Sequence, residues 1–119
     1  MSPKVYCIIM LMMLLAACAT YYTTPQSLVN QLKDSRSNGE FSTITEVNCI
    51  DKDGKARVIQ VDGNTQMRIT RKDNSREAFY FSTGYLLDSM ISGKKSIILG
   101  IMIRPVKLSD IKMIELQQK

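Results

Sequence analysis

Short segments that contain β-branched or aromatic residues, separated by compact polar turns, constrain the fold of this chain most. Four such segments follow one another, at residues 43–50, 56–61, 66–71 and 77–82. Three Asp-containing turns separate them, at residues 51–54, 62–64 and 73–75. In the third segment Met67 and Ile69 alternate with polar residues, and the Asp53-Gly54 pair accepts the positive φ angles of a tight hairpin. The pattern predicts four antiparallel strands arranged as a meander.

A short helix is expected before these strands. Leu28 and Leu32 recur at helical spacing, which predicts an amphipathic helix over residues 25–35. Thr23 is placed to cap its first turn. Gly39 is suited to the left-handed conformation that ends many helices. A helix of this length depends on docking its apolar face against a sheet, because its intrinsic propensity is too weak to hold it alone.

The C-terminal part alternates less regularly. Residues 83–93 predict a helical turn or a packed loop, and the continuously apolar stretch Ser96–Ile103 predicts a strand covered on both faces. A 3₁₀ turn at residues 109–110 then precedes a last strand over residues 112–116. Residues 106–116 resemble the close of SH3-like and Sm-like small barrels, in which a short turn separates the last two strands.

The expected fold class is therefore mainly β (α+β). One short N-terminal helix is followed by a small antiparallel sheet or by a partly open SH3-like β-barrel, since small sheets often curl to protect their edges.

A separate segment precedes all of these elements. Lys4 is followed by an apolar run from Val5 to Leu15 and then by two alanines and Cys18. A membrane-spanning helix needs about 20 apolar residues, so this shorter run after a positive charge is typical of a secretory signal. A short membrane anchor and a buried N-terminal helix are the alternatives.

Leu15-Ala16-Ala17-Cys18 is similar to the lipobox of bacterial lipoproteins. The resemblance implies a signal peptide over residues 1–17, a lipid (diacylglycerol carrying fatty acids such as palmitate) on the thiol of Cys18, and cleavage just before Cys18. It places the protein in the bacterial cell envelope, anchored to a membrane. Ala19 is not the aspartate associated with inner-membrane retention in enterobacteria, so the outer membrane facing the periplasm is expected.

Under this interpretation the mature chain has two parts. Residues 18–24 are expected to be a tether, and residues 25–119 a single small β-rich domain. Tyr21 and Tyr22 have two alternatives, since they could rest among lipid headgroups or pack on the domain.

Composition excludes several kinds of chemistry. The chain contains no histidine, so no serine–histidine or cysteine–histidine pair can form. Cys49 is the one cysteine left after signal removal and acylation, which excludes an intramolecular disulfide and the usual zinc clusters. It is expected to be a small buried hydrophobe. Residues 51–54 look superficially like a calcium loop, but the twelfth position is Asp62 rather than glutamate. The sequence therefore predicts a protein that is not an enzyme and has no metal or cofactor.

Four basic residues surround the third turn: Arg68, Arg71, Lys72 and Arg76. They form either a solvated face or a contact for an anionic partner such as lipid A, phospholipid or peptidoglycan. Nucleic acid is not expected, because the signal removes the chain from the cytoplasm.

The predicted function is a non-catalytic binding or scaffolding β-domain on a lipid anchor, with envelope proteins, peptidoglycan or anionic lipid as partners. One alternative is a periplasmic inhibitor or protective lipoprotein that acts on a cell-wall hydrolase. A second alternative, which requires the N-terminal segment to stay uncleaved, is a cytoplasmic Sm-like nucleic-acid binder.

Overall fold

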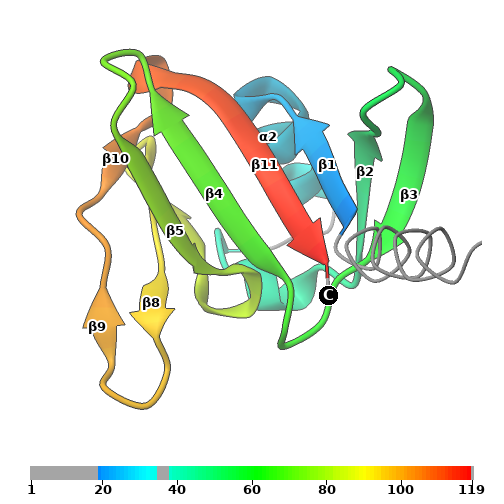
Figure 1. The fold of residues 1–119 in the computed structure, drawn as a ribbon. Coiled ribbons are helices and arrows are strands. Elements are labelled where there is room, and N and C mark those ends of the chain that lie inside the picture. The colour runs from blue at the N-terminus through cyan, green and yellow to red at the C-terminus, as the bar shows by residue number, and fades with distance from the viewer. Residues whose placement is uncertain (1–18, 35–37, 119) are drawn as a thin grey trace, which may run out of the picture.

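The computed structural model of this chain describes residues 19–34 and 38–118, which form an α+β domain of antiparallel sheets and one α-helix (Figure 1). The largest sheet has six strands in the order β3-β2-β1-β11-β4-β5. In chain order they are β1 (Ala19–Thr23), β2 (Glu46–Ile50), β3 (Ala56–Gln60), β4 (Gln66–Arg71), β5 (Arg76–Tyr80) and β11 (Ile111–Gln118). The sheets do not close into a barrel. The predicted α+β class with a small antiparallel sheet is confirmed.

Two smaller sheets follow β5. One has three strands in the order β10-β7-β6, and the other is the hairpin of β8 and β9. Their strands are β6 (Tyr85–Leu87), β7 (Met90–Ser92), β8 (Lys94–Ser96), β9 (Ile101–Met102) and β10 (Val106–Lys107). Three 3₁₀ turns connect the elements, namely η1 (Phe41–Thr43), η2 (Phe81–Thr83) and η3 (Leu108–Asp110). The last of them confirms the predicted 3₁₀ turn before the final strand.

Strand β1 corrects the predicted tether. It pairs with β11 along its whole length, from Ala19 opposite Gln118 to Thr23 opposite Ile114. The prediction of a tether over residues 18–24 is therefore wrong for residues 19–23. Thr-Tyr-Tyr-Thr is a sequence of β-branched and aromatic residues, which fits a pleated and half-buried surface.

The predicted meander is wrong at its centre. The expected hairpins form between β2 and β3 and between β4 and β5. However, β1 and β11 lie between β2 and β4, so the turn at residues 62–64 connects strands that are not neighbours. The predicted turn at residues 62–64 does form, but the presence of a turn does not determine whether the two strands that it connects pair with each other.

Helix α2 (Pro25–Asp34) confirms the predicted helix, with a different cap. The backbone N–H of Ser27 donates to Oγ1 of Thr24 at 3.1 Å. Thr23 is still the last residue of β1, so the capping position falls one residue later than predicted. Among the described residues, no helix has the length and apolar character needed to cross a membrane.

A side-chain amide attaches α2 to the sheet. Gln31 donates from Nε2 to the carbonyl of Asn48 at 3.1 Å, and its Oε1 accepts the N–H of Asn48 at 2.8 Å. Beside this part of β2 the chain has already left β1 and entered α2. The amide of Gln31 therefore takes the place of a neighbouring strand and satisfies backbone groups that would otherwise be open.

The core lies between α2, the inner face of the six-stranded sheet and the smaller sheets. Three phenylalanines join these layers, with ring centroids 5.3 Å apart for Phe41 and Phe81 and 6.3 Å apart for Phe41 and Phe79. Apart from the phenylalanines, the apolar side chains that are at most 1% exposed are Leu28, Val47, Met67, Ile69, Ile91, Val106, Ile114 and Leu116. Cys49 is also buried, as predicted.

The region after β5 departs most from expectation. Residues 83–93 contain the hairpin of β6 and β7, whose turn residues Asp88 and Ser89 both have positive φ angles. The prediction that Ser96–Ile103 is a covered strand is wrong. This stretch turns at Gly100, where φ is +65°, and residues 97–102 are exposed. A continuous apolar run does not by itself distinguish a buried strand from an exposed hairpin.

Candidate functional site

The predicted attachment residue, Cys18, and the rest of the motif Leu15-Ala16-Ala17-Cys18 lie outside the described residues. The structure does place the residue that follows them. Ala19 begins β1, opposite Gln118 near the end of β11. No spacer therefore separates position 18 from the sheet. In Figure 1 the beginning of β1 and the end of β11 lie at the same end of the sheet.

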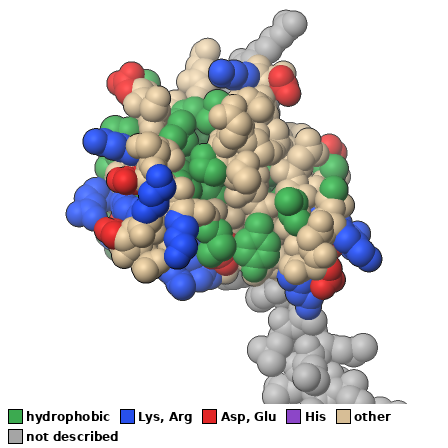
Figure 2. All heavy atoms as spheres, turned by 90° about the horizontal axis from the view of Figure 1, so that it is seen from above, with side chains coloured by type: hydrophobic (Ala, Val, Ile, Leu, Met, Phe, Trp, Pro, Cys, Tyr) green, Lys and Arg blue, Asp and Glu red, His purple; other side chains and the backbone are tan. Residues whose placement is uncertain are grey.

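Two residues of the predicted basic cluster share one face of the sheet. Arg68 lies opposite Glu115 on one side and Ala78 on the other. Arg76 lies opposite Thr70, which is on the same face as Arg68 because side chains two residues apart share a face. Lys72 is exposed in the β4–β5 turn nearby. Seen from the end that carries this turn, basic side chains gather on the side of the turn, with acidic side chains between them (Figure 2).

The structure does not bring Arg71 to this face. Only 7% of Arg71 is exposed, and its Nη1 lies 3.2 Å from Oε1 of Glu77. Its Nη2 donates to the carbonyl of Arg104 at 3.2 Å. Arg71 is two residues after Ile69, so strict alternation already places it on the inner face. That signal was in the sequence, and it separates Arg71 from the half-buried Arg68 and from the exposed Lys72 and Arg76.

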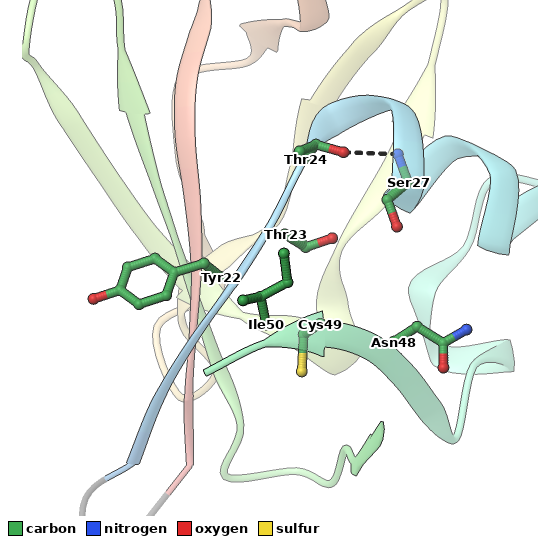
Figure 3. A pocket seen from close by; sticks show the side chains of 7 residues that line it. All are labelled: Tyr22, Thr23, Thr24, Ser27, Asn48, Cys49 and Ile50. Atoms are coloured by element: carbon green, nitrogen blue, oxygen red, sulfur yellow. Dashed lines mark hydrogen bonds between the residues drawn. The ribbon is translucent and has the colours of Figure 1, made fainter. Parts of the chain in front are cut away.

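A pocket of about 290 Å³ lies where β1 passes into α2, beside β2 (Figure 3). It is lined by Tyr22, Thr23, Thr24, Ser27, Asn48, Cys49 and Ile50. Among the described residues, Oγ1 of Thr23 is buried without a hydrogen-bond partner. The lining residues come from three separate elements, and no sequence motif joins them, so sequence reasoning missed this pocket.

The thiol of Cys49 is poorly suited to nucleophilic chemistry. It lies 3.6 Å from the carbonyl of Arg57, to which it donates a weak hydrogen bond. Burial raises the pKa of the Cys49 thiol, and the neighbouring Asp51 carboxylate raises it further. Because the thiolate is the reactive species, a raised pKa keeps the group neutral and inert near neutral pH.

The carboxylate of Asp51 organises the β2–β3 turn. It accepts hydrogen bonds from the N–H of Asp53 at 2.9 Å, from the N–H of Lys55 at 3.0 Å and from Nε of Arg57 at 2.9 Å. The bond from Arg57 is the main reason that the pKa of Asp51 lies below its ordinary value. These contacts support a turn rather than a calcium loop. The described residues contain no group of three or more acidic, cysteine or histidine side chains placed to hold a metal ion.

Replacing Asp51 with Asn is expected to lower the thermal midpoint at neutral pH, because the amide loses the ion pair and one of the acceptor positions. The folded-state pKa is lowered, so the stabilisation is fully present above the unfolded value of 3.8 and is lost as the pH falls through the lower folded value. The difference between Asp51→Asn and the parent chain should therefore shrink below about pH 4. Thermal denaturation across pH measures this, with Asp53→Asn as the control within the same turn. A difference that stays constant with pH would contradict the prediction.

Comparisons of this chain with protein-family models, curated proteins and solved structures find no match. Functional inference therefore depends on the chain's own residues and on where the fold places them.

Proposed function

We propose that this chain is a lipid-anchored lipoprotein of the bacterial cell envelope, with a β-domain that binds or scaffolds other envelope components without catalysis. The observation that carries the proposal is the order of residues at the start of the chain: Lys4, a short apolar run, two alanines and Cys18. The outer membrane, with the domain facing the periplasm, is the proposed location.

The position of β1 supports this proposal in a specific way. Cleavage before Cys18 would remove only residues that precede the six-stranded sheet, and every described element would remain. Because β1 starts at Ala19, a lipid on Cys18 would hold the domain directly against the membrane surface. The end of the sheet that carries Ala19 and Gln118 would then face the lipid.

Three observations support a non-catalytic domain. The sequence has no histidine, the thiol of Cys49 is buried with a raised pKa, and the Asp51 carboxylate is occupied by its own turn. The half-buried Arg68 and the exposed Lys72 and Arg76 remain the proposed contact for an anionic partner. Because Lys72 and Arg76 lie at the end of the sheet opposite to Ala19 and Gln118, peptidoglycan fits this orientation better than the lipid of the anchoring membrane.

Metabolic labelling with radioactive palmitate in a bacterial host tests the anchor. The parent chain is expected to incorporate label and to lose residues 1–17, as measured by mass spectrometry. Cys18→Ala is expected to incorporate none and to keep its full length, because the acylated thiol is missing. Cys49→Ala is the matched control and should be labelled like the parent, since its thiol is buried in the domain.

Two results would contradict the proposal. The first is label on Cys18→Ala, which would assign acylation to another residue. The second is an unlabelled parent chain that stays uncleaved in the membrane fraction, which would return residues 5–15 to a spanning anchor. Separation of inner and outer membranes by density then tests the proposed location.

A further inference from the structure

Residues 94–104, which contain the hairpin of β8 and β9, expose a contiguous group of apolar side chains. We call this segment the apolar hairpin. At its tip Ile98 is 96% exposed and Leu99 is 72% exposed. The adjoining residues Ile97, Ile101 and Met102 are between 40% and 53% exposed. Scattered exposed apolar side chains are ordinary, but a contiguous group of this kind marks an interaction surface.

The tip projects from a fixed base. Ile103 is buried, and its N–H donates to the carbonyl of Gly93 at 2.9 Å. The hydroxyl of Ser92 donates to the carbonyl of Ile103 at 3.1 Å. On the other strand, the N–H of Lys94 donates to Oγ1 of Thr83 at 2.8 Å. These bonds hold both strands at the base, so the exposed side chains are presented by a braced element.

The charged residues of the apolar hairpin are all basic. Lys94, Lys95 and Arg104 lie at its base, and the sequence between Asp88 and Asp110 contains no acidic residue. All three basic residues are exposed. The order of apolar tip and basic base along the hairpin corresponds to the order of acyl chains and anionic headgroups in a bilayer. The tip would enter the acyl region while the cations remain among the headgroups.

The direction of the apolar hairpin agrees with the proposed anchor. In Figure 1 it extends toward the same end of the molecule as the end of β11, which is paired with the beginning of β1. A domain held at its Ala19 end would therefore turn the hairpin tip toward the membrane.

We infer that the apolar hairpin inserts into an anionic phospholipid bilayer and forms a second membrane contact beside the anchor. The inference rests on the proposed membrane location but does not require acylation of Cys18. A second copy of this chain fits the hairpin less well, because tip-to-tip contact would bring two sets of basic residues together without a carboxylate to pair them.

The sequence contains no tryptophan, so a single tryptophan reports on one position. Ile98→Trp places it at the tip, and Val58→Trp is the matched control on β3, where Val58 is 62% exposed. Both full chains are reconstituted into vesicles of phosphatidylcholine and phosphatidylglycerol, with or without lipids brominated in their acyl chains. Circular dichroism confirms that both fold.

Bromination is expected to reduce the emission of Ile98→Trp about twofold or more and to leave Val58→Trp nearly unchanged, because only the tip reaches the acyl region. Adding Lys94→Gln, Lys95→Gln and Arg104→Gln should at least halve that quenching, and so should vesicles of phosphatidylcholine alone, to about the same extent.

Equal quenching at both positions would overturn the inference, since the tip would then be no deeper than β3. A blue-shifted Ile98→Trp that appears without vesicles and is insensitive to bromination would also overturn it and would assign the hairpin to a protein contact. Failure of the palmitate test with strong tip quenching would remove the lipid anchor and keep the hairpin, so the two proposals fail separately.

Discussion

Replacing Arg71 with Met is expected to lower the free energy of unfolding by about 2–3 kcal/mol, because it leaves the charge of Glu77 partly buried and unpaired. Arg71 contacts Glu77 at 3.2 Å, Ser75 at 3.4 Å and the carbonyl of Arg104 at 3.2 Å. The substitution removes all three contacts while keeping much of the side-chain volume. Glu77 retains 21% exposure of its side chain, so water offsets part of the loss and the expected value lies below the roughly 3–5 kcal/mol of a fully buried pair.

Urea denaturation measures this effect, and the exposed residues Lys72 and Arg76 provide controls. Lys72→Gln and Arg76→Gln are expected to change stability by no more than about 0.5 kcal/mol. The double variant of Arg71→Met with Glu77→Leu should recover a substantial part of the loss, because it removes the stranded charge. If Arg71→Met behaves like the two controls, the assignment of Arg71 to a structural network is wrong.

Arg71 also shows where sequence reasoning succeeded and where it failed. The alternation of Met67 and Ile69 predicts an inner face for β4, whereas charge alone groups Arg71 with its basic neighbours. The structure follows the alternation, which places the guanidinium inside and gives it a carboxylate and a carbonyl. At this position the spacing along the strand predicts the surroundings of Arg71 better than its charge does.

Local features of the fold were predictable, and long-range pairing was not. Residue types predicted the Asp51–Gly54 and Asp73–Ser75 turns. Asp and Asn side chains can accept hydrogen bonds from the backbone of a turn, and Gly adopts positive φ angles without strain. Nothing in the sequence indicated that β1 and β11, from opposite ends of the chain, would pair in the middle of the sheet. The five residues of β1 are too few for a periodic signal.

The candidate sites divide in the same way. Cys18 was predicted from a contiguous motif and still awaits its labelling test. The apolar hairpin was visible as a run of apolar residues, but its exposure depends on Ser92, Gly93 and Thr83, which hold the base from outside the run. The pocket beside Thr23 depends on three elements meeting and leaves no pattern in any one of them.

Gly39 is predicted to end the helix, and the structure also places its backbone in close contact with the backbone of Leu86. Its φ angle is +94°, and a Cβ built there would stand 2.2 Å from the carbonyl oxygen of Leu86. The N–H of Leu86 donates to the carbonyl of Gly39 at 2.7 Å, and the N–H of Phe41 donates to the carbonyl of Gly84 at 2.9 Å. This close approach joins the chain leaving α2 to the strand β6.

Gly39→Ala is therefore expected to cost about 3 kcal/mol, from the positive φ angle and from contact with a backbone atom that cannot rotate away. Gly54→Ala separates the two causes, because Gly54 has a φ angle of +80° and no atom within 4 Å of its built Cβ. It should cost only about 1 kcal/mol, the conformational part alone. Urea denaturation of both variants measures the difference. Equal losses would mean that the backbone at Leu86 yields to the methyl group, and the junction between α2 and β6 would then be softer than its short hydrogen bonds indicate.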